Sequence, residues 1–191
     1  MNPLLLVVNA GSSSLKFGVY EGNEESLDLA YSGQITGIGS HAPHFRVRTS
    51  ERPGLVDRVL SADDAGSLDA AQVLVSAWLA QNLKRDPDAV GHRIVHGGPN
   101  YRDSVLITPE VVAELEGLAS LAPLHQLNNL HPVHVIAQRW PNLPLVACFD
   151  TAFHRGHSDI TERFAIPERF FQQGVRRYGF HGLSYEYISG Y

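Results

Sequence analysis

The sequence has little of several features that mark whole classes of protein. A single cysteine, Cys148, among 191 residues excludes an internal disulfide and is typical of a reducing compartment. The longest apolar run, Leu4 to Val8, is far shorter than the ~20 residues that span a bilayer, and no basic segment precedes it as in a secretory signal. Lys and Arg number 15 against 20 Asp and Glu, which is not the charge balance of a nucleic-acid or anionic-membrane binder. We therefore expect a cytoplasmic protein that binds neither nucleic acid nor membrane.

Hydrophobic residues make up 43% of the chain, enough for a globular core, and their spacing changes along the sequence. Alternating or continuous apolar runs predict strands, and apolar residues at helical spacing predict helices. Strands are expected at 4–8, 15–20, 27–31, 45–49, 89–95 and 145–149, and helices at 67–83, after Thr108-Pro109 and around 133–140. The run 4–8 is apolar throughout, as in a strand covered on both faces. Hairpin strands followed by strand–helix alternation predict an α/β domain, with a mixed sheet flanked by helices.

The character of the chain changes after Asp150. Residues 151–178 are rich in His, Arg, Phe and Glu with weak periodicity, and a new helix is expected from Ser184. We therefore divide the chain into a first domain at 1–150 and, at 151–191, a linker with the opening segment of a second, incomplete domain. A helix that begins with nothing to pack against indicates a fragment, whose exposed apolar surface favours self-association.

A turn of small residues with three hydroxyl groups lies between the first two expected strands. Its backbone N–H groups, with Ser12, Ser14 and Lys16 nearby, can hold a phosphate. The turn is not a Walker A loop, because the second glycine and the hydroxyl residue after the lysine are absent. A polar hairpin turn without a ligand is the alternative.

Three polar side chains stand where α/β proteins often bind substrates. Arg93 lies near the end of a buried run and precedes Gly97-Gly98, whose bare backbone lets a ligand approach. A guanidinium there needs an anion, either a ligand or a structural carboxylate. Asp150 ends a strand at the edge where binding crevices form, or else it caps the loop. His181, flanked by glycine and close to two arginines, can donate to negative charge on a transferring phosphoryl group, although a lone histidine is more often structural.

The ten histidines raise the question of a metal site. His92 and His96 are four residues apart, and His131 and His134 are three apart. The first pair falls on an expected strand, where that spacing is too long for one zinc ion, and the sequence has no H-E-x-x-H motif. A histidine-bound zinc is therefore not favoured.

Five short motifs are spread over nearly the whole chain. They are Asn9-Ala10-Gly11-Ser12-Ser13-Ser14-Leu15-Lys16-Phe17, Gly91-His92-Arg93-Ile94-Val95-His96-Gly97-Gly98, Pro123-Leu124-His125-Gln126, Phe149-Asp150-Thr151-Ala152-Phe153-His154 and Arg177-Tyr178-Gly179-Phe180-His181-Gly182. In this order they closely resemble the acetate kinase family. Propionate and butyrate kinases share much of the pattern, so the motifs define the family and leave the acid open.

The resemblance implies a ribonuclease H-like fold, shared with sugar kinases, heat-shock chaperones and actin, in which two α/β domains close over a nucleotide. It implies reversible phosphoryl transfer from ATP to acetate, giving ADP and acetyl phosphate, with Mg²⁺ or Mn²⁺, in a homodimer of the full-length protein. Family members are roughly twice as long as this chain, and the remaining half holds the adenosine-binding segment. We therefore expect this chain alone to bind small carboxylates or phosphate weakly, without useful turnover.

The resemblance also assigns roles to matching positions. The phosphate and metal side would comprise Asn9, which organises the Mg²⁺–phosphate group, and Ser12, Ser14 and Lys16. The acyl side would comprise Arg93 on the carboxylate, Val95, Leu124 and Phe180 around the methyl group, and His125 as a polar contact. Asp150, His181 and Arg93 would be the catalytic residues. Because acetate is already an anion, Asp150 is expected to orient Arg93 or a metal-bound water, or to handle a phosphate proton, and not to act as a base on acetate. A binding module without chemistry, and a phosphatase or hydrolase in which Asp150 positions water, are the alternatives.

Overall fold

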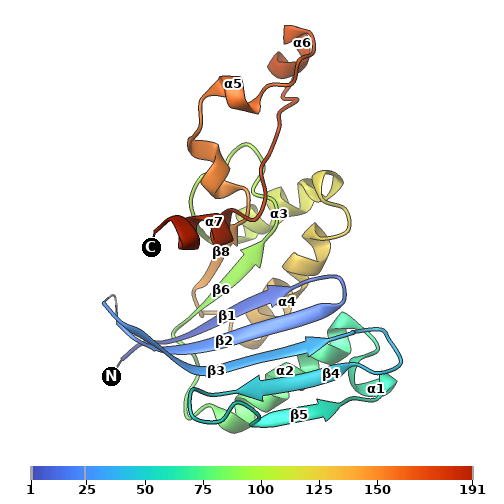
Figure 1. Cartoon of the computed structure of the whole chain (residues 1–191), viewed down its shortest axis with the longest axis vertical. Coiled ribbons are helices and arrows are strands. Elements are labelled where there is room, and N and C mark those ends of the chain that lie inside the picture. The colour runs from blue at the N-terminus through green and yellow to red at the C-terminus, as the bar shows by residue number, and fades with distance from the viewer. Residues whose placement is uncertain (1, 24, 191) are drawn as a thin grey trace.

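The computed structural model describes residues 2–23 and 25–190 and is built around one mixed sheet (Figure 1). Within these residues the sheet has eight strands in the order β5-β4-β3-β2-β1-β6-β8-β7. The strands are β1 (Leu4–Ala10), β2 (Ser14–Gly22), β3 (Leu27–Thr36), β4 (His44–Arg48), β5 (Val56–Val59), β6 (Ala89–Ile94), β7 (Val105–Leu106) and β8 (Leu145–Phe149). Strands β1 to β5 are antiparallel neighbours, β1, β6 and β8 run parallel, and β7 pairs antiparallel with β8. The predicted α/β class with a mixed sheet is confirmed.

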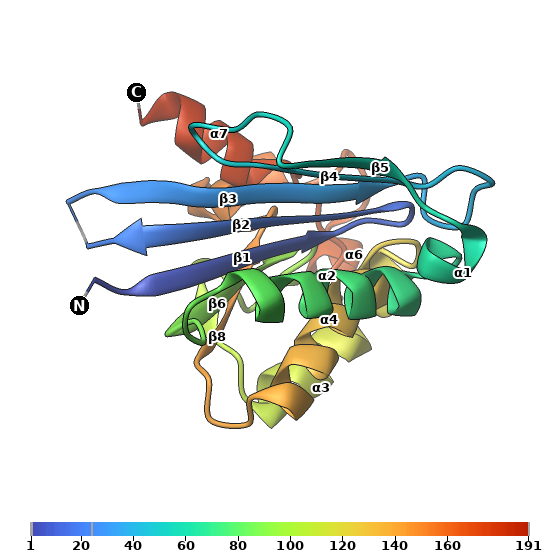
Figure 2. The ribbon, with the colours of Figure 1, turned by 90° about the horizontal axis from the view of Figure 1, so that it is seen from below.

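Helices connect the parallel strands and pack on one face of the sheet. Helices α1 (Ala62–Ala65) and α2 (Leu68–Asn82) lead from β5 to β6. Helix α3 (Pro109–Gly117), the 3-10 turn η1 (Ala119–Leu121) and helix α4 (Gln126–Arg139) lie between β6 and β8 in the chain. Figure 2 shows α2 and α4 on the same side of the strands. The Thr108 hydroxyl caps α3 by accepting the Val111 N–H, as the Thr-Pro pair predicts.

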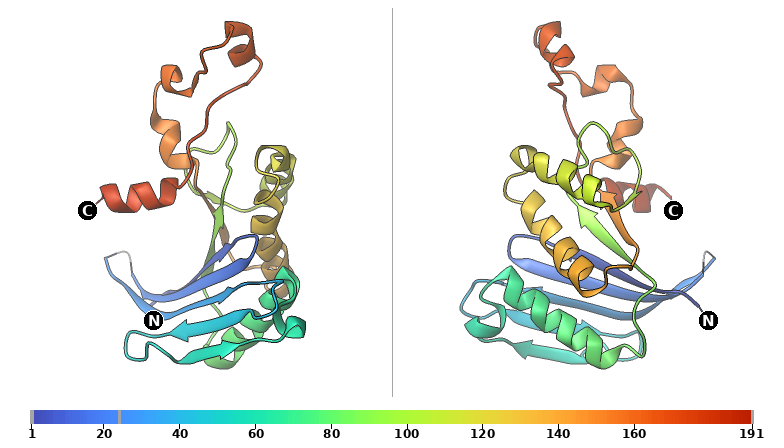
Figure 3. Two further views of the ribbon diagram at one scale, coloured as in Figure 1. Left: turned by 45° about the vertical axis from the view of Figure 1, so that its right-hand side comes forward. Right: turned by 180° about the vertical axis from the view of Figure 1, so that it is seen from behind.

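The residues after β8 form an arm that leaves the sheet and returns to it. They comprise η2 (Ala152–Gly156), α5 (Asp159–Glu162), α6 (Glu168–Gln172) and α7 (Gly182–Ser189). Helices α5 and α6 project beyond the sheet (Figure 1), whereas α7 lies on the side of β6 and β8 away from α3 and α4 (Figure 3). The buried Glu162 carboxylate pairs with Arg155 and, at 3.1 Å, with Arg176, which holds the two ends of the arm together. In the ranges that the structure describes, no helix is long and apolar enough to cross a membrane.

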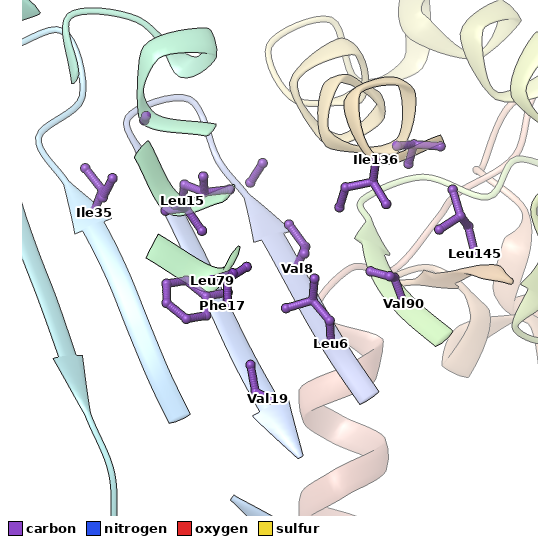
Figure 4. Close-up of a cluster of buried hydrophobic side chains, with 14 of the residues drawn as sticks. Leu6, Val8, Leu15, Phe17, Val19, Ile35, Leu79, Val90, Ile136 and Leu145 are labelled. Carbon is purple, nitrogen blue, oxygen red and sulfur yellow. The ribbon is translucent and has the colours of Figure 1, made fainter. Parts of the chain in front are cut away.

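The core lies between the sheet and the helices α2 and α4. Alternate side chains of six strands, β1 to β4, β6 and β8, point into it, because successive residues of a strand face opposite sides. Figure 4 shows Leu6, Val8, Leu15, Phe17, Val90, Leu145, Leu79 and Ile136 in this cluster. The expectation that the apolar run 4–8 is covered on both faces is wrong, since Val7 is 42% exposed on the face opposite the helices. That face of β1 instead carries Asn9 at its end, towards the site described below.

Several elements differ from the sequence prediction in their limits. Strand β3 continues five residues past Tyr31, and α4 starts at Gln126, ahead of Pro132. A proline inside a helix removes one N–H donor, but the packed apolar face of α4 compensates for that loss. The sequence prediction used only the apolar residues after the proline and therefore placed the start of this helix too late. Strands β5 and β7 and helix α1 are two to four residues long, too short for either periodicity to register.

His92 introduces an ionisable group into this core. It lies in the middle of β6 on the helix-covered face and is 1% exposed. Neither ring nitrogen has a hydrogen-bond partner within residues 2–23 and 25–190. Burial therefore lowers the pKa of His92 from 6.5 to about 4, because the charged ring would lose its hydration without a compensating contact.

This depressed pKa predicts a pH-dependent stability. The unfolded chain takes up a proton at His92 near pH 6.5 and the folded chain only near pH 4, so stability is present above pH 6.5 and is lost as the pH falls towards 4. At about 1.4 kcal/mol for each unit, the loss through this residue is about 3 kcal/mol. We expect the unfolding free energy, measured with urea, to fall between pH 7 and pH 4 by about 3 kcal/mol less in His92→Leu than in the unchanged protein. Exposed His41→Leu is the control, and equal losses in all three proteins would contradict the prediction.

Candidate active site

Five segments of the chain meet at a cavity of about 490 Å³. It lies at the carboxyl ends of β1, β6 and β8, where parallel strands of an α/β sheet usually form binding crevices. Its lining residues are Ala10, Gly11, Ser12, Ser13, Ser14, Arg93, Val95, Leu121, Ala122, His125, Asn129, Asp150, Phe180 and His181. The structure therefore brings the serine turn, Arg93, Asp150 and His181 together in one place.

Arg93 and Asp150 form the charged centre of this cavity. Arg93 Nε donates to Asp150 Oδ1 at 3.0 Å and Nη2 to Oδ2 at 2.5 Å, while Nη1 donates to Asn9 Oδ1 at 3.1 Å. The register of β1 and β6 pairs Val8 with His92, so Asn9 and Arg93 come next on the face away from the core. Asp150 is 2% exposed, and this pairing compensates its buried charge. Three of the five guanidinium N–H groups are used, which leaves two for a ligand.

A short strap, residues 178–182, carries Phe180 and His181 to the cavity. The Gly182 N–H donates to the Asp150 carbonyl at 2.7 Å, and His154 Nε2 donates to the Phe180 carbonyl at 2.9 Å. Between these bonds His181 has φ 60° and ψ 23°, and no other non-glycine residue in the described ranges has a positive φ. Such backbone strain persists only where the surroundings hold it. The strap is thus fixed on both sides of the His181 imidazole.

The acyl side of the cavity differs in part from the expectation. Val95, Phe180 and His125 line the cavity as expected. Leu124 is 74% exposed and lies outside the lining, and Leu121 and Ala122 occupy the wall instead. The chain changes direction at η1 before α4 begins at Gln126, and Leu124 lies in the turn between them, outside the wall.

Lys16 lies outside this cavity. Strand alternation places it on the same sheet face as Asn9, its register partner on β1. There it lines a separate depression of about 270 Å³ together with Arg46 and Arg48. Ser12 and Ser14 line the cavity itself, so the structure separates the lysine from the two hydroxyl groups of the turn.

Two residues to which the sequence analysis gave no role in the site, Asn129 outside the motifs and His96 within the second motif, hold the site in place. Asn129 on α4 accepts the Val95 N–H at 2.8 Å and donates to the Ala10 carbonyl at 2.5 Å, so it links the ends of β1 and β6. His96 contacts the Phe180 ring edge-on, with ring centres 5.7 Å apart, and accepts the Gly98 N–H at Nδ1. Burial and the nearby Arg155 lower the pKa of His96, which keeps this ring neutral behind the wall. The sequence signal for Asn129 was a polar residue on an apolar helix face, and that for His96 was its place in the motif before Gly97-Gly98.

Comparison with known proteins decides the family. The model of the Acetokinase family matches residues 4–191. The chain belongs to this family. An acetate kinase of Nitrobacter hamburgensis is 50% identical over 97% of this chain and 46% of its own length. The crystal structure of Porphyromonas gingivalis acetate kinase superposes with a TM-score of 0.82 at 35% identity, over 98% of this chain and 47% of that one. A propionate kinase structure from Francisella tularensis gives a TM-score of 0.85 at 30% identity, with the same coverage.

These comparisons confirm the predicted family and fold, including the actin-like domain. The chain spans about half the length of the curated relatives it matches. The cavity described above is therefore formed by the portion of the family sequence that this chain covers. Among the described side chains, no three His, Cys, Asp or Glu residues gather closely enough to hold a metal ion by themselves.

The strap predicts a specific effect of a single methyl group. A Cβ at Gly182 would lie 2.4 Å from the Asp150 carbonyl oxygen and 2.8 Å from Phe153 Cβ, so Gly182→Ala must displace the strap. We expect a loss of about 1–3 kcal/mol in unfolding free energy and faster hydrogen exchange at the amide of residue 182. Gly156→Ala is the control, because no described atom lies within 4 Å of its Cβ. Unchanged exchange in Gly182→Ala would show that the strap is not held at Asp150.

Proposed function

We propose that the chain supplies the acyl- and phosphate-binding part of an acetate kinase, which transfers a phosphoryl group from ATP to acetate and yields ADP and acetyl phosphate. The observation that carries the proposal is the Arg93–Asp150 pair in a cavity that also contains an apolar wall, two serine hydroxyls and His181. The proposal includes a cytoplasmic location, a second domain that opens at 151–191 and a homodimer of the full-length enzyme, as the family resemblance implies.

The carboxylate of the acyl substrate needs a cationic partner and its methyl group needs an apolar surface, and the cavity has both. The free N–H groups of Arg93 can bind the acetate carboxylate, and Val95, Phe180 and Leu121 line the space for the methyl group. Acetate is ionised at neutral pH, so no base has to activate it. The protein's contribution to phosphoryl transfer is then mainly in-line positioning and compensation of charge.

The phosphate side is formed by donors that surround the same cavity. Ser12 and Ser14 bring hydroxyl groups, and the turn Gly11–Ser14 brings backbone N–H groups. The imidazole of His181, which lines the cavity, would donate to the equatorial oxygens as their negative charge grows. Lys16 would reach the outer phosphates of a nucleotide from the adjoining depression that it lines.

Asp150 acts as a positioning residue in this proposal. Both of its carboxylate oxygens accept N–H groups of Arg93, and its carbonyl accepts the Gly182 N–H. A carboxylate so engaged orients the guanidinium, and acetate, which carries no proton at neutral pH, does not need it as a base. The side chains of Asn9 and Asp150 have the oxygen chemistry that Mg²⁺ favours. They would contact, through water, a Mg²⁺ ion bound to the nucleotide phosphates. That ion would neutralise part of the phosphate charge.

Propionate is the second candidate acyl substrate. The similarity to a propionate kinase structure favours it, and one methylene in an apolar pocket changes binding by only ~1–3 kcal/mol. The choice between the two acids therefore depends on where the apolar wall stands.

Carboxylate binding by the 191-residue chain tests the acyl site. We expect acetate to bind weakly in an NMR titration with ¹³C-labelled acetate. Arg93→Lys should weaken binding about 10- to 150-fold, because a charge-assisted hydrogen bond of about 1.5–3 kcal/mol is lost with the planar guanidinium. Arg48→Lys, on the same sheet face but outside the cavity, serves as the matched control. Equal effects of the two substitutions would refute the assignment of Arg93.

The products distinguish a kinase from a binding module and from a hydrolase. With ATP, acetate and Mg²⁺, we expect the 191-residue chain alone to form no acyl phosphate that hydroxylamine can trap. A chain extended to the length of the relatives should form it. Release of free phosphate without trapped acyl phosphate would indicate a hydrolase, and kinase-level turnover by the 191-residue chain would contradict the division of labour proposed here. If the extended chain forms neither product, the remaining interpretation is a binding module without chemistry.

A further inference from the structure

His154 lies next to the cavity without lining it, and it contacts the strap in two ways. Its Nε2 lies 2.9 Å from the Phe180 carbonyl oxygen. A carbonyl can only accept, so Nε2 carries the hydrogen and donates. The ring also lies flat against the backbone of Gly179, where a Cβ would be only 2.4 to 2.6 Å from three ring atoms. Residue 179 must therefore be glycine for the imidazole to stand where it does.

The surroundings of His154 fix the direction of its ring. Phe153 and Tyr185 meet it edge-on, with ring centres 5.4 and 5.7 Å away, and these two rings stack on each other. Tyr185 belongs to α7 and Phe153 to η2, so the imidazole sits where the arm's first and last elements meet. The position of His154 is thus determined from both ends of the arm.

What His154 holds is the apolar wall of the cavity. Phe180 lines the cavity with Val95, and its ring is 38% exposed, so packing alone does not fix it. Its main chain is tied at its own carbonyl by His154 and two residues later by the bond from Gly182 to Asp150. Loss of the first bond leaves the main chain of the strap attached at Tyr178, whose ring packs on His96, and at Gly182, with no hydrogen bond at Phe180 itself. The Phe180 ring could then move outward and lengthen the acyl pocket.

We propose that His154 is a positioning residue which, through the Phe180 carbonyl, sets the depth of the acyl pocket and so the length of the acid that fits. The proposal rests on the proposed function, since it assumes that the cavity binds a small carboxylate. His154 touches no substrate. It acts through the place of Phe180 and, next in the chain, through the strained backbone of His181.

Two variants of the 191-residue chain separate the donor from the ring. His154→Gln keeps an N–H donor at a similar reach, and His154→Phe keeps a flat ring against Gly179 but cannot donate. His41→Phe is the control, since His41 is exposed in the loop between β3 and β4 and belongs to neither the arm nor the strap. The measurements are the hydrogen exchange of the Gly182 amide, the nuclear Overhauser contact between the Phe180 and His96 rings, and the dissociation constants of acetate and propionate by NMR titration.

We expect His154→Phe to speed Gly182 exchange at least 10-fold, to weaken the Phe180–His96 contact and to shift the binding preference towards propionate at least 5-fold. His154→Gln should show only a small part of each effect, and His41→Phe should change none. A His154→Phe chain with unchanged exchange and unchanged preference would overturn the proposal, as would equal behaviour of the Gln and Phe variants. If the Phe variant does not fold, His154→Ala replaces it in the same comparison with Gln.

Failure of the proposed function gives a different result. If the unchanged chain binds neither acid, the carboxylate site is wrong, and the effect on acyl length is wrong with it. Exchange at Gly182 and the Phe180–His96 contact then still show whether His154 positions the strap. If the unchanged chain binds acetate but His154→Phe does not alter the preference, only the inference about His154 is refuted.

Discussion

The paired charges of Arg93 and Asp150 connect the parts of this site. A carboxylate as deeply buried as Asp150 is stable only with a partner, and Arg93 provides two hydrogen bonds to it and a third to Asn9. The same residue holds the strap through its backbone carbonyl. One residue at the end of β8 thereby determines the orientation of the guanidinium on β6 and the start of α7. Side chains far apart in sequence come to face one cavity because three parallel strands end at the same edge.

Much of this arrangement follows from local sequence patterns. Alternating and apolar runs predicted six of the eight described strands to within a few residues at most ends, and the end of β8 just before Asp150 was placed correctly. An arginine within an apolar run and before two glycines pointed to an anion, and the structure supplies the carboxylate as its partner. Arg93 can therefore pair with a structural carboxylate and also bind a ligand, since the pair leaves N–H groups of the guanidinium free.

The rest depends on contacts that a linear pattern does not contain. Leu124 and Leu121 are both apolar and only three residues apart, and the 3-10 turn before α4 decides that the second faces the cavity. Lys16 follows the serine turn closely in sequence, but strand alternation turns it onto the open sheet face beside Asn9. The supporting role of Asn129 needs the ends of β1 and β6 to be adjacent. The positions of Leu121 and Asn129 are set by tertiary packing, whereas the face of Lys16 follows from strand alternation once the limits of its strand are known.

The two sides of the cavity are held by contacts of different range. The proposed phosphate side is one hairpin between adjacent strands, and the guanidinium is fixed by an ion pair with the buried Asp150, so both belong to the sheet and its edge. The proposed acyl wall depends on Phe180, on a strap held by a hydrogen bond from the His154 side chain and by one from the Gly182 N–H to the Asp150 carbonyl. A change in the strap can therefore alter the apolar space without disturbing the charged centre. Acetate and propionate kinases that share this fold closely are consistent with such a division, because their reactions differ only in the part of the acid that meets the wall.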